Sequence, residues 1–280
     1  MTIIENKTFD EERALYGSDG VRAVGCRFDG PADGESAFKE SKNVETEGCY
    51  FNLRYPFWHT RTLKITDCEM TSLCRAALWY SDNITIDNTK LHGIKALREC
   101  DCIRIRNSSI ISPEFGWFSR NIIMDKTEAE GEYFMLRAEN LTFTDVTLHG
   151  KYSFQYIKNC TFENCNFDTK DAFWHAENVV VKNSVIKGEY LAWYAKNITF
   201  IDCEISGTQP LCYCKNLKLI NCTMEGTDLS FEYSDVEATV AGHIDSVKNP
   251  HSGRIVADSV GEIIFGDAVM ECTGTVEIRK

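Results

Sequence analysis

The residue types best suited to acid–base chemistry lie near the start of the chain. Glu40 and His59 are 19 residues apart, which is also the interval at which most of the sequence repeats. If successive repeats stack, the Glu40 carboxylate lies close enough to the His59 imidazole to orient it for proton transfer. Lys39, Arg54 and Tyr80 complete this candidate catalytic group.

The repeat is interrupted near this group by two insertions, at residues 29–36 and 71–75. Insertions in a repeat protein map to loops, often on the binding face, and a ligand pocket needs concavity. We therefore expect any ligand site in the N-terminal third of the chain. The candidate ligand-binding residues there are Asp33, Glu35, Tyr55, Trp58, Trp79, Arg98 and Glu99.

The element that must position these side chains is a short structural repeat. Asparagine occupies positions 83, 121, 140, 159, 178, 197 and 216, and every interval is 19 residues or a multiple of 19. Self-similarity at so short a period, with aliphatic residues at every second place, is typical of a β-solenoid. We predict an all-β fold, a right-handed single-stranded parallel β-helix of 19-residue coils, about a dozen in number.

Numbering each coil from its asparagine separates structural columns from others. Positions 2, 4, 7 and 9 are apolar or small, so they are predicted to point inward, because alternate strand residues share a face. Position 6 holds Asn or Asp, which tolerate a left-handed backbone and mark a turn. Amides at positions 1 and 6 are expected to form ladders of hydrogen bonds between coils.

All five tryptophans fall at position 16, and position 17 holds mostly aromatic and charged residues. Strict alternation predicts that position 17 faces water and that the tryptophans fill the core. The alternative is a bend that places both columns outside, as a strip suited to sugar faces or to a partner.

The thirteen cysteines suggest neither a disulfide framework nor a metal site. Six of them fall at position 7, where a buried thiol behaves as a small apolar side chain. The pairs Cys100/Cys102 and Cys212/Cys214 are six coils apart, too far to share one zinc ion. We expect reduced thiols, no structural metal and no cofactor.

Composition limits the range of partners. The net charge is −12 and the charges of both signs are scattered, which argues against nucleic-acid binding. We find no signal segment and no apolar run of membrane-spanning length, so we expect a cytoplasmic protein with no membrane partner. Residues 1–19 are expected to form a turn or short helix that caps a single β-helix domain, residues 20–280. The last strands would cap the other end or provide an edge for a homo-oligomer.

Three segments carry a resemblance to a known family: residues 9–16 (FDEERALY), 32–40 (ADGESAFKE) and 53–59 (LRYPFWH). The chain resembles, over nearly its whole length, a family of bacterial proteins catalogued as a domain of unknown function. The resemblance implies a right-handed parallel β-helix in a bacterial cytosol and implies no activity. The architecture is also similar to that of pectin lyases and polygalacturonases, but the chain has no Asp-Asp pair.

Two functions of different class remain open at this stage. The chain is a binding or scaffold protein whose aromatic strip engages a saccharide, a small molecule or another subunit. Alternatively, it is a carbohydrate-active lyase or hydrolase that uses the Glu40 and His59 group. The sequence contains no nucleophile elbow, phosphate loop or histidines at metal-ligand spacing, and this favours the binding function.

Overall fold

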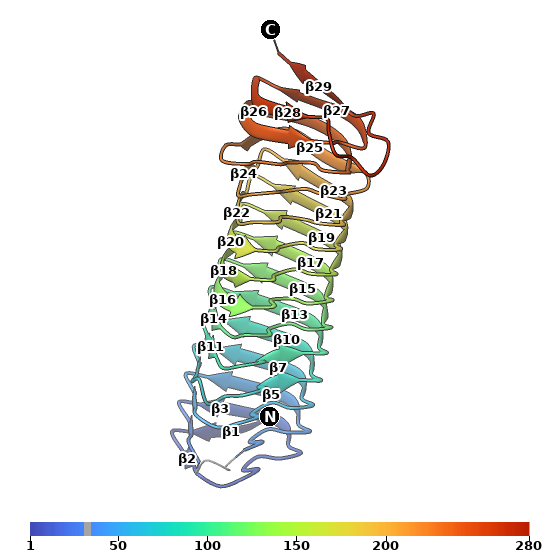
Figure 1. Ribbon diagram of the computed structural model, residues 1–280. Coiled ribbons are helices and arrows are strands. Elements are labelled where there is room, and N and C mark those ends of the chain that lie inside the picture. The colour runs from blue at the N-terminus through green and yellow to red at the C-terminus, as the bar shows by residue number, and fades with distance from the viewer. Residues whose placement is uncertain (31–34, 280) are drawn as a thin grey trace. The chain divides into compact units, whose positions relative to one another are not determined.

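The computed structural model describes residues 1–30 and 35–279, and all regular structure within them is β-strand (Figure 1). The predicted fold class is confirmed: the chain is a parallel β-solenoid with a repeat of about 19 residues and about 14 coils. By internal contacts it divides into an N-terminal unit, residues 1–142, and a C-terminal unit, residues 143–280. Each unit is described by itself.

In the N-terminal unit each coil has a longer first strand and a short second strand. The first strands are β1 (Thr2–Glu5), β3 (Asp19–Val24), β5 (Lys42–Glu47), β7 (Arg61–Thr66), β10 (Asp82–Asp87), β13 (Asp101–Arg106), β15 (Arg120–Asp125) and β17 (Glu139–Thr144). The second strands are β2 (Thr8–Phe9), β4 (Arg27–Phe28), β6 (Tyr50–Phe51), β8 (Glu69–Met70), β11 (Lys90–His92), β14 (Ser109–Ile111) and β16 (Glu128–Glu132). A third side is built from turns and carries one short parallel pair, β9 (Leu78–Trp79) and β12 (Leu97–Arg98).

The C-terminal unit repeats this arrangement. Its first strands are β19 (Lys158–Glu163), β21 (Glu177–Lys182), β23 (Lys196–Ile201), β25 (Leu217–Met224), β27 (Ser252–Ala257) and β29 (Thr275–Ile278). Its second strands are β18 (Thr147–Lys151), β20 (Asn166–Lys170), β22 (Val185–Lys187), β24 (Glu204–Ser206) and β28 (Ser259–Ile264). The long strand β26 (Asp235–Lys248) pairs with β27 along its first half and with β28 along its second.

Neighbouring coils align the same repeat position, as in the pairing of Ile84 with Ile103 and of Val181 with Phe200. Phe143, Phe162 and Phe200 are fully buried, and so are the position-7 cysteines, which confirms the predicted inward columns. The core is therefore a stack of like residues, each touching its counterpart one coil away.

The asparagine column is structural, as predicted. From residue 43 to residue 216 the position-1 residues all have φ between 51° and 59°, a left-handed conformation that Asn adopts more readily than most residues. In the C-terminal unit the Asn197 amide donates to Asn178, and the Asn178 amide donates to Asn159, each at 3.0 Å. The ladder joins successive coils at the corner where each strand begins.

Residues 1–19 form a coil of the solenoid. Strand β1 pairs in parallel with β3, β2 pairs with β4, and the Phe9 ring stacks on Phe28 with centroids 5.0 Å apart. Residues 10–17 form turns, and no helix covers the first coil within the described residues. A capping role for residues 1–19 stays a prediction. The described chain contains no helix long and apolar enough to span a membrane.

Candidate functional site

The tryptophan column lies on the outer side of the solenoid, so the prediction that it fills the core is wrong. All five tryptophans are only partly buried. Four indole nitrogens each donate a hydrogen bond to a backbone carbonyl 16 residues further along the chain, at 2.5–2.7 Å: Trp79 to Lys95, Trp117 to Tyr133, Trp174 to Tyr190, and Trp193 to Gln209. These bonds hold the indole rings against the turns of the next coil.

The backbone at position 17 explains why positions 16 and 17 share the outer side. From His59 to Tyr213, the residues at this position have φ between 50° and 61°. Side chains alternate between two faces only while the backbone stays extended, and a left-handed residue ends that alternation. The bend considered in the sequence analysis is therefore present in every coil.

In the C-terminal unit the position-17 rings form a continuous parallel stack. His175 lies between Tyr156 and Tyr194, with ring centroids 4.7 and 5.0 Å away and interplanar angles of 9°. Tyr213 continues the stack at 4.8 Å from Tyr194. Because each ring face is covered by its neighbour, this stack, which we call the ring ladder, presents mainly ring edges and hydroxyl groups to solvent.

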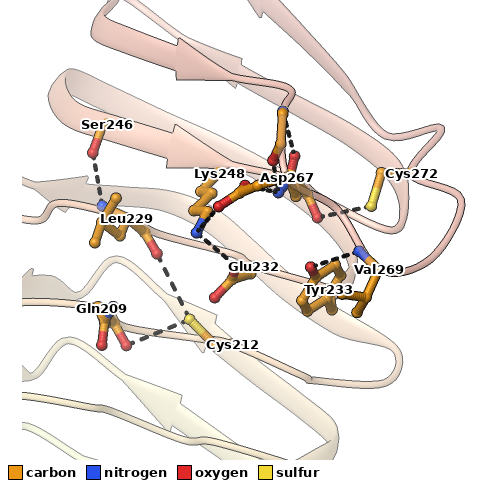
Figure 2. A network of polar contacts seen from close by, with 12 residues as sticks. Gln209, Cys212, Leu229, Glu232, Tyr233, Ser246, Lys248, Asp267, Val269 and Cys272 are labelled. Atoms are coloured by element: carbon orange, nitrogen blue, oxygen red, sulfur yellow. Dashed lines mark hydrogen bonds and ion pairs between the residues drawn. The ribbon is translucent and has the colours of Figure 1, made fainter.

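The ring ladder ends at Tyr233, where the sequence numbering had placed Glu232. Tyr233 has φ 55°, and its ring lies 5.6 Å from that of Tyr213. The register moves by one residue because residues 226–228 contain an extra turn residue. Figure 2 shows the consequence: Glu232 accepts an ion pair from Lys248 at 3.0 Å, and the Tyr233 hydroxyl accepts a hydrogen bond from the Val269 amide.

The N-terminal unit brings the predicted catalytic residues together on the same side of the coil. His59 Nδ1 lies 3.7 Å from a carboxylate oxygen of Glu40, and both side chains are close to half exposed. The His59 ring lies 5.0 Å from that of Tyr80 at a 57° tilt. The Lys39 amine lies over the Trp58 ring, 5.4 Å from its centroid. The group is open to solvent.

Most of the predicted ligand-binding residues adjoin this group. Arg54 pairs with Glu35 at 3.3 Å and lies over the Tyr55 ring, which meets Trp58 edge-on at 4.8 Å. Trp58 in turn lies 5.4 Å from Trp79. Asp33 lies outside the described residues. A role for any of these side chains in binding or catalysis stays a prediction.

One feature of the N-terminal unit has no counterpart in the ring ladder. At position 17 the rings of Tyr80 and Phe118 are separated by Glu99, one coil from each. A hollow of about 470 Å³ opens there. We call it the Glu99 gap; it is lined by Asp82, Arg98, Glu99, Cys100, Asp101, Phe118 and Arg120.

The polar groups of the Glu99 gap are of both signs. Arg98 pairs with Glu99 at 3.2 Å, and its guanidinium lies 5.0 Å from the Trp79 centroid and 5.5 Å from that of Phe118. Burial opposes ionisation of Asp101, but hydrogen bonds from Asn121 and Arg120 hold the pKa of this carboxyl below its usual range. Both carboxylates and guanidinium groups are thus available to a ligand.

Sequence reasoning identified Arg98 and Glu99 but missed Phe118, Asp82 and Arg120 as neighbours of the same hollow. The signal was present as an acidic residue between two aromatic residues at one repeat position. Within the described residues, no group of three or more His, Cys, Asp or Glu side chains is arranged to hold a metal ion.

Comparison with known proteins places the chain in a family. The sequence profile described as "Protein of unknown function (DUF3737)" matches residues 2–278. The chain belongs to the DUF3737 family. No sequence among the curated proteins matches this DUF3737 chain significantly.

Solved structures resemble the DUF3737 chain at low identity. PfbA, a surface adhesin of Streptococcus pneumoniae, is 9% identical with a TM-score of 0.46, over 93% of this chain and 85% of PfbA. The catalytic domain of a GH87 α-1,3-glucanase is 11% identical with a TM-score of 0.32, over 98% of this chain and 63% of that one. The A-module of the Azotobacter vinelandii mannuronan C-5 epimerase AlgE4 is 9% identical with a TM-score of 0.34, over 98% and 87%. At these identities the likeness concerns the fold alone.

Proposed function

We propose that this DUF3737 chain is a saccharide-binding protein and that a sugar ring enters the Glu99 gap. The observation that carries the proposal is the missing ring at position 17. Two steps of the sheet spacing separate Tyr80 from Phe118, roughly 9–10 Å. That is the room taken by one ring stacked between two others.

The chemistry of the gap suits a neutral sugar better than a charged or wholly apolar ligand. Phe118 is 44% exposed and Tyr80 is 36% exposed, so both offer aromatic surface for the C–H faces of a pyranose. The carboxylates of Asp82 and Glu99 accept hydrogen bonds from hydroxyl groups, and the guanidinium of Arg98 donates them. The mixed signs give no strong attraction for an ion.

The ring ladder of the C-terminal unit is a poorer candidate. Its ring faces are covered by parallel neighbours at 4.7–5.0 Å, and a sugar stacks on the face of a ring. We assign it a structural role.

A carbohydrate-active enzyme is the second candidate, because Glu40 and His59 are in contact. Their separation of 3.7 Å exceeds a hydrogen bond, and the pair is open to water. Acid–base catalysis on a sugar would require a cleft that excludes water around these groups. The hollow lies instead at Glu99, and this favours binding over turnover.

The test is a glycan array followed by calorimetric titration of each oligosaccharide that binds. The variant Glu99→Tyr supplies the missing ring and should abolish binding, while the unfolding temperature stays the same or rises. Tyr194→Ala, in the ring ladder, is the matched control and should bind as the wild type does. Unchanged binding by Glu99→Tyr, or an array with no bound glycan, would overturn the proposal.

A further inference from the structure

A second hollow of the N-terminal unit is apolar and differs in kind from the Glu99 gap. Its volume is about 440 Å³, within the usual range for small-molecule sites. It is lined by Gly30, Asn52, Leu53, Arg54, Ser72, Leu73, Arg75 and Ile94. Of the residues expected to form the catalytic or ligand site, only Arg54 borders it.

The insertion at residues 71–75 builds the wall of this hollow and is fixed in place. The Thr71 hydroxyl donates to the Asn52 side chain at 2.6 Å, and the Cys74 amide donates to the Thr71 carbonyl. Gly93 lies directly under the insertion: a Cβ at this residue would come within 2.6 Å of the Cys74 carbonyl oxygen. The wall is therefore a packed part of the fold.

The apolar residues of the hollow are unusually exposed. Leu73 is 58% exposed and Ile94 is 36% exposed, although both are large aliphatic side chains. Leu53 forms the buried floor. Exposed aliphatic groups gathered around a concavity are typical of a binding site, because a ligand that covers them removes apolar surface from water.

The charges at the hollow are of one sign. Its described lining contains two guanidinium groups, those of Arg54 and Arg75, and no carboxylate. Arg54 pairs with Glu35. The Arg75 side chain makes neither an ion pair nor a hydrogen bond with any residue of the described chain. In a protein with a net charge of −12, this is a local site for an anion.

We propose that this hollow binds a small amphiphilic carboxylate: an aliphatic body against Leu53, Leu73 and Ile94, and a carboxylate on Arg75. A guanidinium binds a carboxylate through two parallel hydrogen bonds, which suits a single anionic head at the rim. This ligand chemistry differs from that of the Glu99 gap, and the inference is independent of the proposed function.

The test is calorimetric titration of the whole chain with octanoate, with octan-1-ol as the uncharged analogue. Octanoate should bind saturably, and octan-1-ol should bind at least tenfold more weakly. Arg75→Gln should reduce octanoate binding to the level of octan-1-ol. Arg104→Gln, which changes an exposed arginine on β13, should leave it unchanged.

Two further variants separate the possible results. Ser72→Trp fills the hollow from an exposed position and should abolish binding of both probes without unfolding the protein. Glu99→Tyr should not affect octanoate, so failure here is distinguishable from failure of the saccharide proposal. Absence of saturable octanoate binding, or equal binding by Arg75→Gln and the wild type, would overturn the inference.

Discussion

The indole nitrogen of Trp193 donates a hydrogen bond to the backbone carbonyl of Gln209, 16 residues further along the chain, at 2.7 Å. This bond crosses from one coil to the next on the turn-rich side, where β-strand hydrogen bonds are few. The ring also stacks on Trp174 with centroids 5.5 Å apart and planes 5° apart. The tryptophan column thus links neighbouring coils by both donor and ring.

Trp193→Phe should lower the free energy of unfolding by about 1 kcal/mol, because the Gln209 carbonyl loses a donor while an aromatic ring remains. Tyr194→Phe is the control, since it keeps the stacked ring of the neighbouring residue. Urea denaturation of both variants measures the difference. Equal stability of Trp193→Phe and the wild type would show that the indole hydrogen bond contributes nothing.

The pH dependence of stability should change when His175 is replaced. Burial between Tyr156 and Tyr194, and secondarily the charge of Lys196, hold the pKa of His175 below its usual value. The unfolded chain therefore binds a proton more readily, so this contribution to stability is complete above the ordinary histidine pKa of about 6.5 and is lost as the pH falls through it.

His175→Tyr keeps the stack and removes the titrating group. Its loss of stability between about pH 7 and pH 5 should be smaller than that of the wild type. His92, whose pKa burial and Lys90 also lower, is present in both proteins, so its contribution cancels in the comparison. Identical pH profiles would contradict the shielding of His175.

The thiols should differ sharply in reactivity. Cys102 is exposed, whereas eleven of the thirteen cysteines are buried. Burial raises the pKa of Cys165 to about 11 and that of Cys214 to about 12, which leaves very little reactive thiolate at neutral pH. Alkylation of the native protein should modify Cys102 first, and Cys102→Ser should remove that rapid phase.

The same reagent in denaturant, without reductant, should titrate thirteen thiols. Each cysteine is a free thiol in the structure. A count clearly below thirteen would reveal a disulfide and contradict the description of position 7 as a stack of reduced side chains.

Restoring the asparagine column should stabilise the protein. Cys102 occupies position 1 with φ 58°, a conformation that costs most L-residues roughly 1–2 kcal/mol but is more readily adopted by Asn. Cys102→Asn should raise the free energy of unfolding by about 1 kcal/mol relative to Cys102→Ser, because Asn also offers an amide to the ladder. Equal denaturation midpoints for these two variants would contradict this interpretation of the column.

The core and corner columns were predictable because they repeat. Phe143 and Phe162 are one period apart with like neighbours, and alternation along an extended strand fixes their direction. The direction of Trp193 was not predictable in the same way. Tyr, His and Phe seldom adopt a left-handed backbone, so nothing in the residue type of Tyr194 announces the bend that places Trp193 outside.

The candidate site was only partly accessible to sequence reasoning. The contact between Glu40 and His59 follows from the repeat alone. The position of the concavities does not, because it depends on how residues 71–75 fold against Gly93 and on the absence of a ring at Glu99. The insertions suggested a cleft over His59, whereas the hollows lie beside Leu73 and at Glu99.

The central claim, that a sugar ring occupies the Glu99 gap, is tested most directly by NMR of the indole N–H groups. Trp79 and Trp117 both contact Arg98 at the gap, whereas Trp174 and Trp193 lie in the C-terminal unit. Titration with a bound oligosaccharide should shift the signals of Trp79 and Trp117 and leave those of Trp174 and Trp193 in place. Shifts confined to Trp174 and Trp193 would contradict the account and assign binding to the ring ladder.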